Sequence, residues 1–377
     1  MRLLISGGAS GGHVSAALAV AAEFHAAYPD GEVLIVGRKG GVEEVMVREE
    51  GFPLQTIHVR GWDRDSRWKN LRLPAILPPA LVRGLRIVDR FRPDVALGVG
   101  AHAMVPCLVA AWFRGVPYVL QVSEPTGLAH RMLRLGAAAA CVSFASDVEK
   151  FRTRNTTATG YPLRGGFVRR RPNVPPRTLL VMGGSLGSRR INEAVWQALD
   201  GLLARFDEVV HLTGGQDRLR GEALARPGYR PMRRTDDIAA LMGSADLVVS
   251  RAGLATCAEL LAVGLPAILV PGRFGGGHQK HNAARLEASG AAVHVPDREL
   301  TGQRLLRVLD GLGPSRLRAM SDATASLTRP DAARAIVRVL AEVAAAKTAV
   351  PSAVDARAGA AETGREAEPL ELVPDLD

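Results

Sequence analysis

The sequence predicts an α/β protein built from two Rossmann-like, doubly wound domains that face each other across a cleft. Three observations point to this fold class: a length of 377 residues, a repeated unit of apolar run, glycine turn and helix, and a regular alternation of short apolar runs with helical patterns. A chain of this length exceeds the usual size of one hydrophobic core. Hydrophobic residues make up 47% of it, which is typical of a globular protein.

The repeated unit opens each half. LLISGGASG begins at Leu3 and LLVMGGSLG begins at Leu179, so Gly7 and Gly183 occupy equivalent places. The helical patterns that follow are HVSAALAVAAEFHAAY in the first half and SRRINEAVWQALDGLLARF in the second. A strand, a tight glycine turn and a helix form the opening unit of a doubly wound domain.

Further apolar runs predict the remaining strands. They are EVLIVG, DVALGVG, PYVLQV and AACVSF in the first half, and EVVHLTG, ADLVVSRAG, PAILVP and AAVHVP in the second. Helical patterns between most of these runs predict parallel sheets. We expect a first domain over 1–162, a second over 163–345 joined through the Pro- and Arg-rich segment 161–176, and a disordered tail over 346–377.

Composition and net charge indicate what kind of partner the protein binds and in which cellular compartment it lies. The formal net charge of +10 favours anionic partners, although an arginine-rich composition has a neutral explanation in genome composition. The basic residues are scattered and form no nucleic-acid-binding module. No signal peptide or membrane-spanning run is apparent. The three cysteines form no CxxC pair, which is typical of reduced residues in a cytoplasmic protein.

The glycine turns are candidate anion sites. A turn between a strand and a helix presents backbone N–H groups at the positive end of the helix dipole. The first turn contains Gly11 and Gly12, the second contains Gly184, and a third lies at Gly98-Val99-Gly100. The glycine spacing matches neither the dinucleotide fingerprint nor a Walker loop. A purely structural turn is the alternative, but turns in equivalent places favour two sites, one for a phosphorylated donor and one for a phosphorylated acceptor.

A second group of candidate residues lies in the second half. Glu259 sits among apolar residues of a helical pattern. It either faces solvent or accepts hydrogen bonds from the vicinal hydroxyls of a ligand such as a ribose. The run Gly275 to Asn282 follows, with amide and imidazole side chains that suit sugar hydroxyls. His278 and His281 lack a suitably spaced carboxylate or cysteine, so we expect no metal site.

Together these segments resemble the MurG family, the UDP-N-acetylglucosamine transferases of glycosyltransferase family 28. The resemblance covers roughly residues 1–340 and rests on six motifs: GGASGGHVSAALAVA, GVGAHAMVPCLVAAWFRGVPYVL, GYPLR, GGSLGSRRIN, SRAGLATCAELLAVGLPAILVP and HQKHNA. It implies the GT-B fold and transfer of N-acetylglucosamine from UDP-N-acetylglucosamine to lipid I. That reaction completes lipid II for peptidoglycan synthesis, and hence for cell shape and division, on the cytoplasmic face of the membrane.

The resemblance also implies roles for individual residues. His13 matches a proposed general base or acceptor-site group, Arg164 a contact to the donor diphosphate, and Ser185 a phosphate-binding serine. Glu259 matches the acid that holds the uridine ribose, and Gln279 matches a glutamine that binds the N-acetylglucosamine hydroxyls. By the same match Gly184 and Thr235 fall on the donor side, whereas Gly11, Gly12, Gly100 and His102 fall on the acceptor side.

The chain departs from the family pattern at several positions. Gln121-Val122-Ser123-Glu124 stands where the family has His-Glu-Gln-Asn, so Glu124 replaces a sugar-contacting asparagine. Ser15-Ala16-Ala17 replaces a proline-containing segment, Gly100-Ala101-His102 replaces Gly-Gly-Tyr, and Arg234-Thr235 replaces apolar residues near uracil. Most departures lie on the acceptor side, and they leave open an altered acceptor, a divergent lineage or weakened activity.

We expect an inverting transfer in which the acceptor C4 hydroxyl attacks the anomeric carbon and UDP leaves. Neutral imidazole suits proton removal near pH 7, which favours His13 as the base, with His102 and Glu124 as rivals. Arg164 and the amides of the second turn suit the leaving diphosphate. This mechanism needs neither a metal nor another cofactor.

The stretch 60–93 predicts contact with an anionic membrane surface. It interleaves basic residues with apolar ones, among them Trp62, Trp68, Leu71, Leu73, Ile76 and Leu77. Apolar side chains enter the lipid interface while arginines meet anionic headgroups. A core helix with a solvated basic face is the alternative, and the family resemblance favours the membrane.

Three other functions remain compatible with the sequence. A GT-B glycolipid synthase would share the donor half but use another acceptor. A UDP-N-acetylglucosamine 2-epimerase would share the architecture, but the basic apolar stretch argues against it. A non-catalytic nucleotide-sugar-binding protein is consistent with the missing asparagine.

Overall fold

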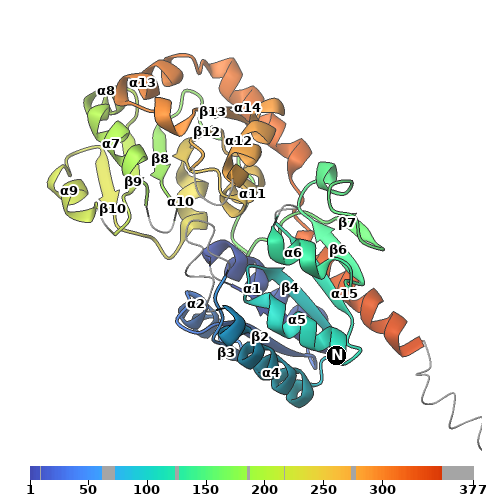
Figure 1. Ribbon diagram of the computed structural model, residues 1–377. Coiled ribbons are helices and arrows are strands. Elements are labelled where there is room, and N and C mark those ends of the chain that lie inside the picture. The colour runs from blue at the N-terminus through green and yellow to red at the C-terminus, as the bar shows by residue number, and fades with distance from the viewer. Residues whose placement is uncertain are drawn as a thin grey trace, which may run out of the picture.

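The computed structural model contains two parallel β-sheets, one in each half of the chain (Figure 1). It describes residues 1–8, 10–61, 73–123, 127–184, 187–215, 217–272 and 277–349. The strand orders are β3-β2-β1-β4-β5-β6-β7 and β10-β9-β8-β11-β12-β13, and every strand pair is parallel. The predicted pair of α/β domains with parallel sheets is therefore confirmed.

The first half contains β1 (Arg2–Gly7), α1 (Gly11–Ala27), β2 (Glu32–Arg38), α2 (Glu43–Glu49), β3 (Leu54–Ile57), α4 (Leu73–Phe91), β4 (Val95–Gly100), α5 (Met104–Phe113), β5 (Tyr118–Val122), α6 (Leu128–Leu133), β6 (Ala139–Val142), η1 (Ala145–Asp147) and β7 (Thr156–Ala158). The second half contains β8 (Thr178–Met182), α7 (Arg189–Gln197), α8 (Leu199–Leu203), β9 (Glu208–Leu212), α9 (Arg218–Ala223), β10 (Tyr229–Met232), α10 (Ile238–Ser244), β11 (Leu247–Ser250), α11 (Leu254–Val263), β12 (Ala267–Leu269), α12 (His278–Ala288), β13 (Ala292–His294), η3 (Asp297–Glu299), α13 (Gly302–Asp310), α14 (Pro314–Leu327) and α15 (Ala332–Ala349).

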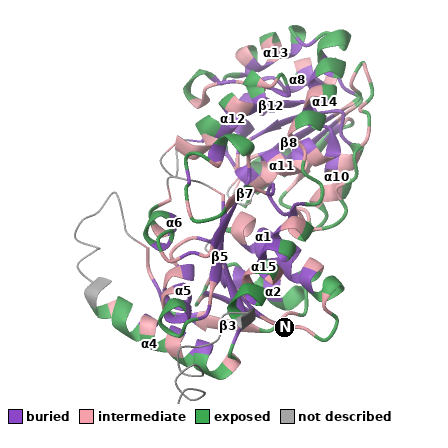
Figure 2. Ribbon diagram, turned by 90° about the vertical axis from the view of Figure 1, so that its right-hand side faces the viewer, coloured by how far each residue is buried: buried purple, intermediate pink, exposed green. Residues whose placement is uncertain are grey.

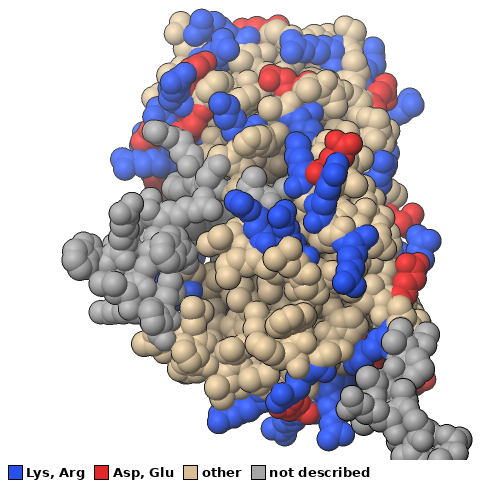
Figure 3. Space-filling view, turned by 45° about the vertical axis from the view of Figure 1, so that its right-hand side comes forward, with Lys and Arg blue, Asp and Glu red and all other residues tan. Residues whose placement is uncertain are grey.

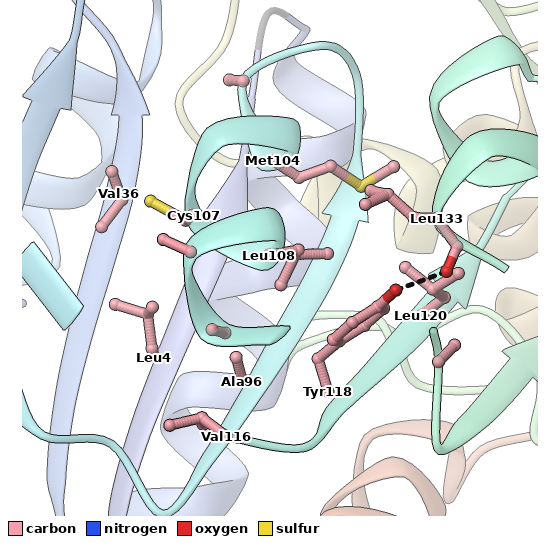
Figure 4. Close-up of a cluster of buried hydrophobic side chains, with 14 of the residues drawn as sticks. Leu4, Val36, Ala96, Met104, Cys107, Leu108, Val116, Tyr118, Leu120 and Leu133 are labelled. Carbon is pink, nitrogen blue, oxygen red and sulfur yellow. Dashed lines mark hydrogen bonds between the residues drawn. The ribbon is translucent and has the colours of Figure 1, made fainter. Parts of the chain in front are cut away.

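Each sheet is buried on both faces, which explains why its strands are continuous apolar runs rather than alternating ones. Leu4 points into a cluster shared with α4 and α5, whereas its neighbours Leu3 and Ile5 point into a cluster shared with α1 and α15. Figure 4 shows the first of these clusters, in which the buried Tyr118 hydroxyl donates to the Leu133 carbonyl at 2.5 Å. Buried residues follow the strands of both halves (Figure 2).

The strand order reverses direction at one point in each sheet, and both points carry a glycine turn. In the first sheet β1 lies between β2 and β4, and in the second β8 lies between β9 and β11. Ligands of open α/β sheets bind outside the carboxyl ends of strands at such switch points. The repeated turns after β1 and β8 therefore both stand where this fold binds ligands.

The helix predicted after β8 is interrupted. The continuous pattern SRRINEAVWQALDGLLARF divides into α7 and α8 at the buried Ala198, whose backbone is not helical (φ −97°, ψ 1°). Gly302 of α13 approaches so closely that a β carbon there would lie 2.6 Å from Gln197. Gln197 Oε1 also accepts a hydrogen bond from the Gly302 N–H at 3.0 Å. Close packing of α13 thus accompanies the break.

The last helix, α15, belongs to the second half of the sequence but packs against the sheet of the first half (Figure 1). We expected residues 163–345 to form the second domain, but the apolar stripe of α15 completes the core beneath β4, β5 and β6, with Ile336 and Leu340 fully buried there. The helix also continues to Ala349, past the expected end of the domain; the rest of the predicted tail, 350–377, lies outside the described residues. The chain therefore crosses between the halves twice, and both crossings meet where Gly160 packs against Arg329 and Ala332.

Candidate functional site

The first glycine turn holds His13 in a defined orientation. Ser10 caps α1, and its hydroxyl accepts a hydrogen bond from the His13 backbone N–H at 3.4 Å. On the His13 ring, Nδ1 lies 3.1 Å from the Gly8 carbonyl oxygen and 2.9 Å from Ser10 Oγ. A carbonyl only accepts hydrogen bonds, so Nδ1 carries the proton in the neutral ring and Nε2 is the basic nitrogen.

The third glycine turn supports the same ring. Gly100 ends β4 beside Gly7 of β1, and its φ of +123° favours glycine. A β carbon on Gly100 would lie 2.6 Å from both Nε2 and Cδ2 of His13. Glycine at position 100 is therefore required for the imidazole to lie over this strand end.

Sequence analysis missed a buried carboxylate beneath the first turn. Glu43, 1% exposed, begins α2 and accepts a hydrogen bond from the Arg38 backbone N–H at 2.8 Å. Three glycines surround its side chain: β carbons at Gly8, Gly37 and Gly41 would lie within 2.0–2.3 Å of Glu43 atoms. These glycines allow a charged group to sit directly under the turn that positions His13.

Two further histidines of the first half, His102 and His130, are enclosed to different degrees. Burial, and then the charge of Arg38, hold the pKa of His102 below its usual value, while Glu43 acts in the opposite direction. The other histidine, His130, was not a sequence-based candidate. Burial lowers its pKa to about 4, with a further contribution from His13, and its ring lies 3.1 Å from the Gln121 carbonyl. His102 is thus a rival base that favours its neutral form, and His130 is a buried neutral support.

The second glycine turn rests on hydrogen bonds made by the Asn192 amide. Gly184 adopts φ +85° and is exposed, and no atom of the residues that the structure describes lies within 4 Å of the position of a β carbon there. Gly187 packs against the Thr213 carbonyl, which accepts a hydrogen bond from Asn192 Nδ2 at 2.8 Å. Ser188 caps α7. The predicted phosphate-binding Ser185 lies outside the described residues, as does the rival base Glu124.

A buried polar chain continues from Asn192 into the core. Asn192 Oδ1 lies 3.0 Å from His211 Nε2, and His211 Nδ1 lies 2.9 Å from the Tyr229 hydroxyl. Burial lowers the pKa of His211 to about 3, so the ring remains neutral. Trp196 Nε1 donates to the same hydroxyl at 2.9 Å. Asn192 Nδ2 also donates to Asp217 Oδ2 at 2.8 Å, so the second turn stands on a hydrogen-bonded network that joins one carboxylate to a neutral histidine.

Glu259 lies where the two halves meet. It is half-buried on α11, and burial raises its pKa to about 7 while the charge of Arg164 opposes the shift. Arg164 Nη1 pairs with Glu50 of the first half at 3.0 Å. Glu259 in turn contributes, after burial, to raising the pKa of Tyr161. The solvent-facing alternative for Glu259 does not describe this enclosed position.

Tyr161 connects that region to the first turn. Its hydroxyl donates to the Gly12 carbonyl at 2.5 Å, and Gly12 also faces the side chain of Ala255 at the start of α11. Strands β8 and β11 are paired with Met182 beside Ser250, so the second turn and the loop before α11 leave the sheet side by side. The structure thus brings Gly12, Tyr161 and α11 together. The glycine Gly11 contacts nothing within 4 Å of its β-carbon position.

The two remaining donor candidates are positioned differently. Gln279 is in the first turn of α12, and its Oε1 accepts a hydrogen bond from the Gly272 N–H at 2.7 Å. Since β12 is next to β11, Gln279 belongs to the same end of the sheet as Glu259. Thr235 accepts a hydrogen bond from the Asp237 N–H at 3.1 Å and follows β10, which is separated from β8 by β9.

Comparison with known proteins identifies the class to which this fold and site belong. Residues 3–124 match the glycosyltransferase family 28 N-terminal domain, and residues 178–336 match the glycosyltransferase family 28 C-terminal domain. The crystal structure of Acinetobacter baumannii MurG aligns with a TM-score of 0.72 at 22% identity, covering 90% of this chain and 99% of that one. The fold is therefore that of a GT-B glycosyltransferase.

Two curated relatives narrow the class. The UDP-N-acetylglucosamine–N-acetylmuramyl-(pentapeptide) pyrophosphoryl-undecaprenol N-acetylglucosamine transferase of Salinibacter ruber is 37% identical, over 89% of this chain and 95% of its own length. The transferase of the same name from Syntrophotalea carbinolica is 38% identical, over 90% and 98%. The chain belongs to this family of N-acetylglucosaminyltransferases, as its motifs predicted.

The described residues contain neither a cluster of possible metal ligands nor a helix suited to crossing a membrane. Nowhere in that part of the chain do three or more His, Cys, Asp or Glu side chains gather as a metal ion would require. Across the same residues, every helix is too short or too polar to span a bilayer.

Proposed function

We propose that this enzyme transfers N-acetylglucosamine from UDP-N-acetylglucosamine to the C4 hydroxyl of undecaprenyl-pyrophosphoryl-N-acetylmuramyl-pentapeptide, converting lipid I to lipid II in peptidoglycan synthesis. Its family membership over nine-tenths of the chain carries the reaction and the substrates. The contact of Gly12 with Tyr161 and Ala255 supports the arrangement, because it places the first turn against the helix that carries Glu259.

In the proposed step, the acceptor hydroxyl attacks the anomeric carbon of the donor sugar. The new bond joins that oxygen to the sugar, the bond between the sugar and the diphosphate breaks, and UDP leaves with the electron pair. His13 Nε2 takes the hydroxyl proton. The fixed Nδ1 proton supports this role, since it keeps the basic nitrogen on the opposite side of the ring.

On the donor side, Glu259 accepts hydrogen bonds from the ribose hydroxyls and the Gln279 amide contacts the sugar. The backbone N–H groups of the second turn and the Arg164 guanidinium stabilise the diphosphate. Arg164 must then exchange Glu50, its partner at 3.0 Å, for a phosphate oxygen. Both partners of this ion pair are exposed, so the exchange costs little.

The proposed chemistry uses no metal ion, because Arg164 and the second turn supply the positive groups that the leaving diphosphate needs. The test is incubation of the purified protein with labelled UDP-N-acetylglucosamine and a soluble lipid I analogue, with and without EDTA. We expect transfer to the analogue at equal rates in both. Donor hydrolysis without transfer would contradict the acceptor assignment, and loss of transfer in EDTA would contradict the metal-free step.

We further propose that the first half binds the cytoplasmic face of an anionic membrane through an apolar surface on α4, α5 and α6. Contacts join α4 to α5 and α5 to α6, and these helices expose large apolar side chains: Leu77, Val82, Trp112, Phe113, Leu128 and Met132, with Leu135 just beyond α6. Exposed arginines on the same helices and at their ends include Arg83, Arg86, Arg131 and Arg134. A broad uncharged area bordered by Lys and Arg is visible in Figure 3.

This surface extends beyond the stretch 60–93 that the sequence indicated. Within that stretch, Ile76 is half-buried and Leu77 is 47% exposed. Trp62, Trp68 and Leu71 lie outside the described residues, as does the side chain of Leu73. The apolar residues on α5 and α6 are further along the chain, and only the packing of the helices brings them to the same face.

Sedimentation with anionic phosphatidylglycerol vesicles tests the membrane proposal. We expect Leu77→Glu combined with Val82→Glu to reduce the bound fraction at least several-fold, because burying charge in the interface is unfavourable. Leu219→Glu is the matched control, since Leu219 is 71% exposed on α9 of the second half. Equal bound fractions of the unmodified protein, the double variant and Leu219→Glu would contradict membrane contact through this surface.

A further inference from the structure

A charged clamp joins the two halves at η1 and α12. Arg285 of α12 donates from both terminal nitrogens to Asp147 of η1, at 2.7 Å to Oδ1 and 3.3 Å to Oδ2. Asp147 is 4% exposed, and the side chain of Arg285 is 22% exposed. Lys150 Nζ, 3.8 Å away and largely exposed, is a second and more distant cation. Two-pronged pairing of this kind fixes orientation as well as distance.

Phe144 completes the clamp. The guanidinium carbon of Arg285 lies 4.0 Å from the centre of the Phe144 ring, a distance typical of a cation–π contact. Phe144 follows β6 in the first half, yet it packs against the buried cluster of the second half that contains Cys257 and Leu286. The first half thus inserts an aromatic side chain into the second, and Arg285 is held between its face and Asp147.

The helix held by this clamp carries the candidate sugar-contacting residue at its other end. Gln279 lies in the first turn of α12 and Arg285 lies in its third. Asn282, between them, donates to the Ala252 carbonyl at 3.1 Å in the loop before α11. That loop leads directly to Ala255, which faces Gly12 of the first turn. A displacement of α12 relative to η1 would therefore change the distance between the donor end of the site and His13.

We propose that Asp147, Arg285 and Phe144 are positioning residues that set the spacing of the two halves for sugar transfer. This inference rests on the proposed function, since α12 is taken to contact the donor sugar. Among the described residues, the hydrogen bonds and the ring contact that form the clamp involve no residue of the glycine turns, and in the proposed function donor affinity comes from second-half residues and Arg164. Losing the clamp should therefore lower kcat and leave UDP affinity nearly unchanged, whereas a purely structural pair would change thermal stability alone.

The first test is a double-mutant cycle with Asp147→Asn and Arg285→Gln. We expect each single variant to lower kcat about tenfold, the double variant to be no worse than either single, and the Kd for UDP to stay within about twofold. The matched control is Asp310→Asn with Arg205→Gln, which removes a 2.7 Å ion pair contained within the second half, and we expect it to leave kcat unchanged. An unchanged kcat in the clamp variants, additive losses, or a Kd that rises in parallel with kcat loss would each overturn the proposal.

The second test does not depend on activity. The native cysteines are buried, so spin labels at Val45→Cys and Leu219→Cys, exposed sites in the first and second halves, report the distance between the halves. We expect Arg285→Gln to broaden the distance distribution and Arg205→Gln to leave it unchanged. An unchanged distribution in the Arg285 variant overturns the clamp. A broadened distribution in the Arg285 variant, together with no sugar transfer by the protein whose clamp is intact, supports the clamp and refutes the proposed function. If Asp147→Asn fails to fold, Arg285→Lys, which keeps the charge but not the two-pronged contact, replaces it, with an expected intermediate kcat.

Discussion

The two glycine turns descend from the same sequence pattern but rest on different chemistry. The first is supported by ionisable groups: the Glu43 carboxylate lies against Gly8, and His13 lies over Gly100. The second is supported by the Asn192 amide, which donates to the Thr213 carbonyl and to the Asp217 carboxylate and is backed by a neutral His211. The repeat thus supplies two similar backbone cradles with different side chains around them, which agrees with the proposed proton transfer at the first turn and the proposed diphosphate binding at the second.

The largest effect should come from removing the base of the first turn. We expect His13→Ala to lower kcat about 100- to 1,000-fold, which is the usual contribution of a positioned general base. Turnover with a soluble lipid I analogue measures it. His102→Ala is the comparison, with an expected loss below about tenfold. If His102→Ala shows the greater loss, the base belongs to the third turn instead.

An alanine should destabilise the protein more at a glycine of the first turn than at a glycine of the second. Gly8→Ala places a β carbon 2.0 Å from Glu43 Oε1 at a φ of +149°, and we expect it to lower the free energy of unfolding by about 3 kcal/mol. The methyl group of Gly184→Ala meets no atom of the described part of the chain and strains the backbone, at a cost of about 1 kcal/mol. Urea denaturation measures both changes, and equal losses would show that packing under the first turn is looser than the structure indicates.

The donor side should be sensitive to pH through one carboxyl. We expect Glu259→Gln to weaken UDP binding about 10-fold or more, since hydrogen bonds to a charged acceptor contribute about 1.5–3 kcal/mol. Burial raises the pKa of Glu259 to about 7, and in the proposed donor site the ionised form accepts the ribose hydroxyls. UDP binding should therefore tighten as pH rises from 6 to 8 and release protons near pH 7. Titration calorimetry measures both, with Glu193→Gln, partly exposed on α7, as the control.

The smallest expected effect compares the buried histidines of the two halves. The pKa values of His130 and His211 are lowered to about 4 and about 3 by burial, whereas an unfolded histidine titrates near 6.5. Stability is therefore full above pH 6.5 and declines as the pH falls toward the folded values. Urea denaturation at pH 7.5 and at pH 5 measures how much of the free energy of unfolding is lost between them. We expect this loss to be about 1–2 kcal/mol smaller in His130→Gln or His211→Gln than in the unmodified protein. The exposed His25→Gln should leave it unchanged.

Much of the fold follows from the sequence because the central strands are continuous apolar runs between helical patterns. The three strands that were not anticipated, β3, β7 and β10, are short and lie at sheet edges. Most of their residues are only partly buried, and β10 contains Pro231, so their apolar signal is weak. The return of α15 was also missed, since an amphipathic helix does not reveal which of two sheets it covers.

For the site, residues within the glycine turns and motifs were predictable, and residues that act through contacts across the chain were not. Glu43 begins a short helix in a polar stretch, where a carboxylate is usually an exposed charge at a helix N-terminus. Only the approach of Gly8 and Gly37 to its side chain reveals its position. Asp147 and Arg285 lie on elements far apart in the sequence, so no local pattern relates them.

The path of the chain through α15 has a consequence for synthesis of the protein. The first half is formed mostly by the first 162 residues, but its core also contains Ile336 and Leu340. As the polypeptide emerges from the ribosome, that core lacks one of its covering helices until nearly the whole chain has been translated. The second half has all its own elements earlier, and translation that stops shortly before residue 332 releases a product in which one face of the N-terminal sheet is covered by α1 but not by α15.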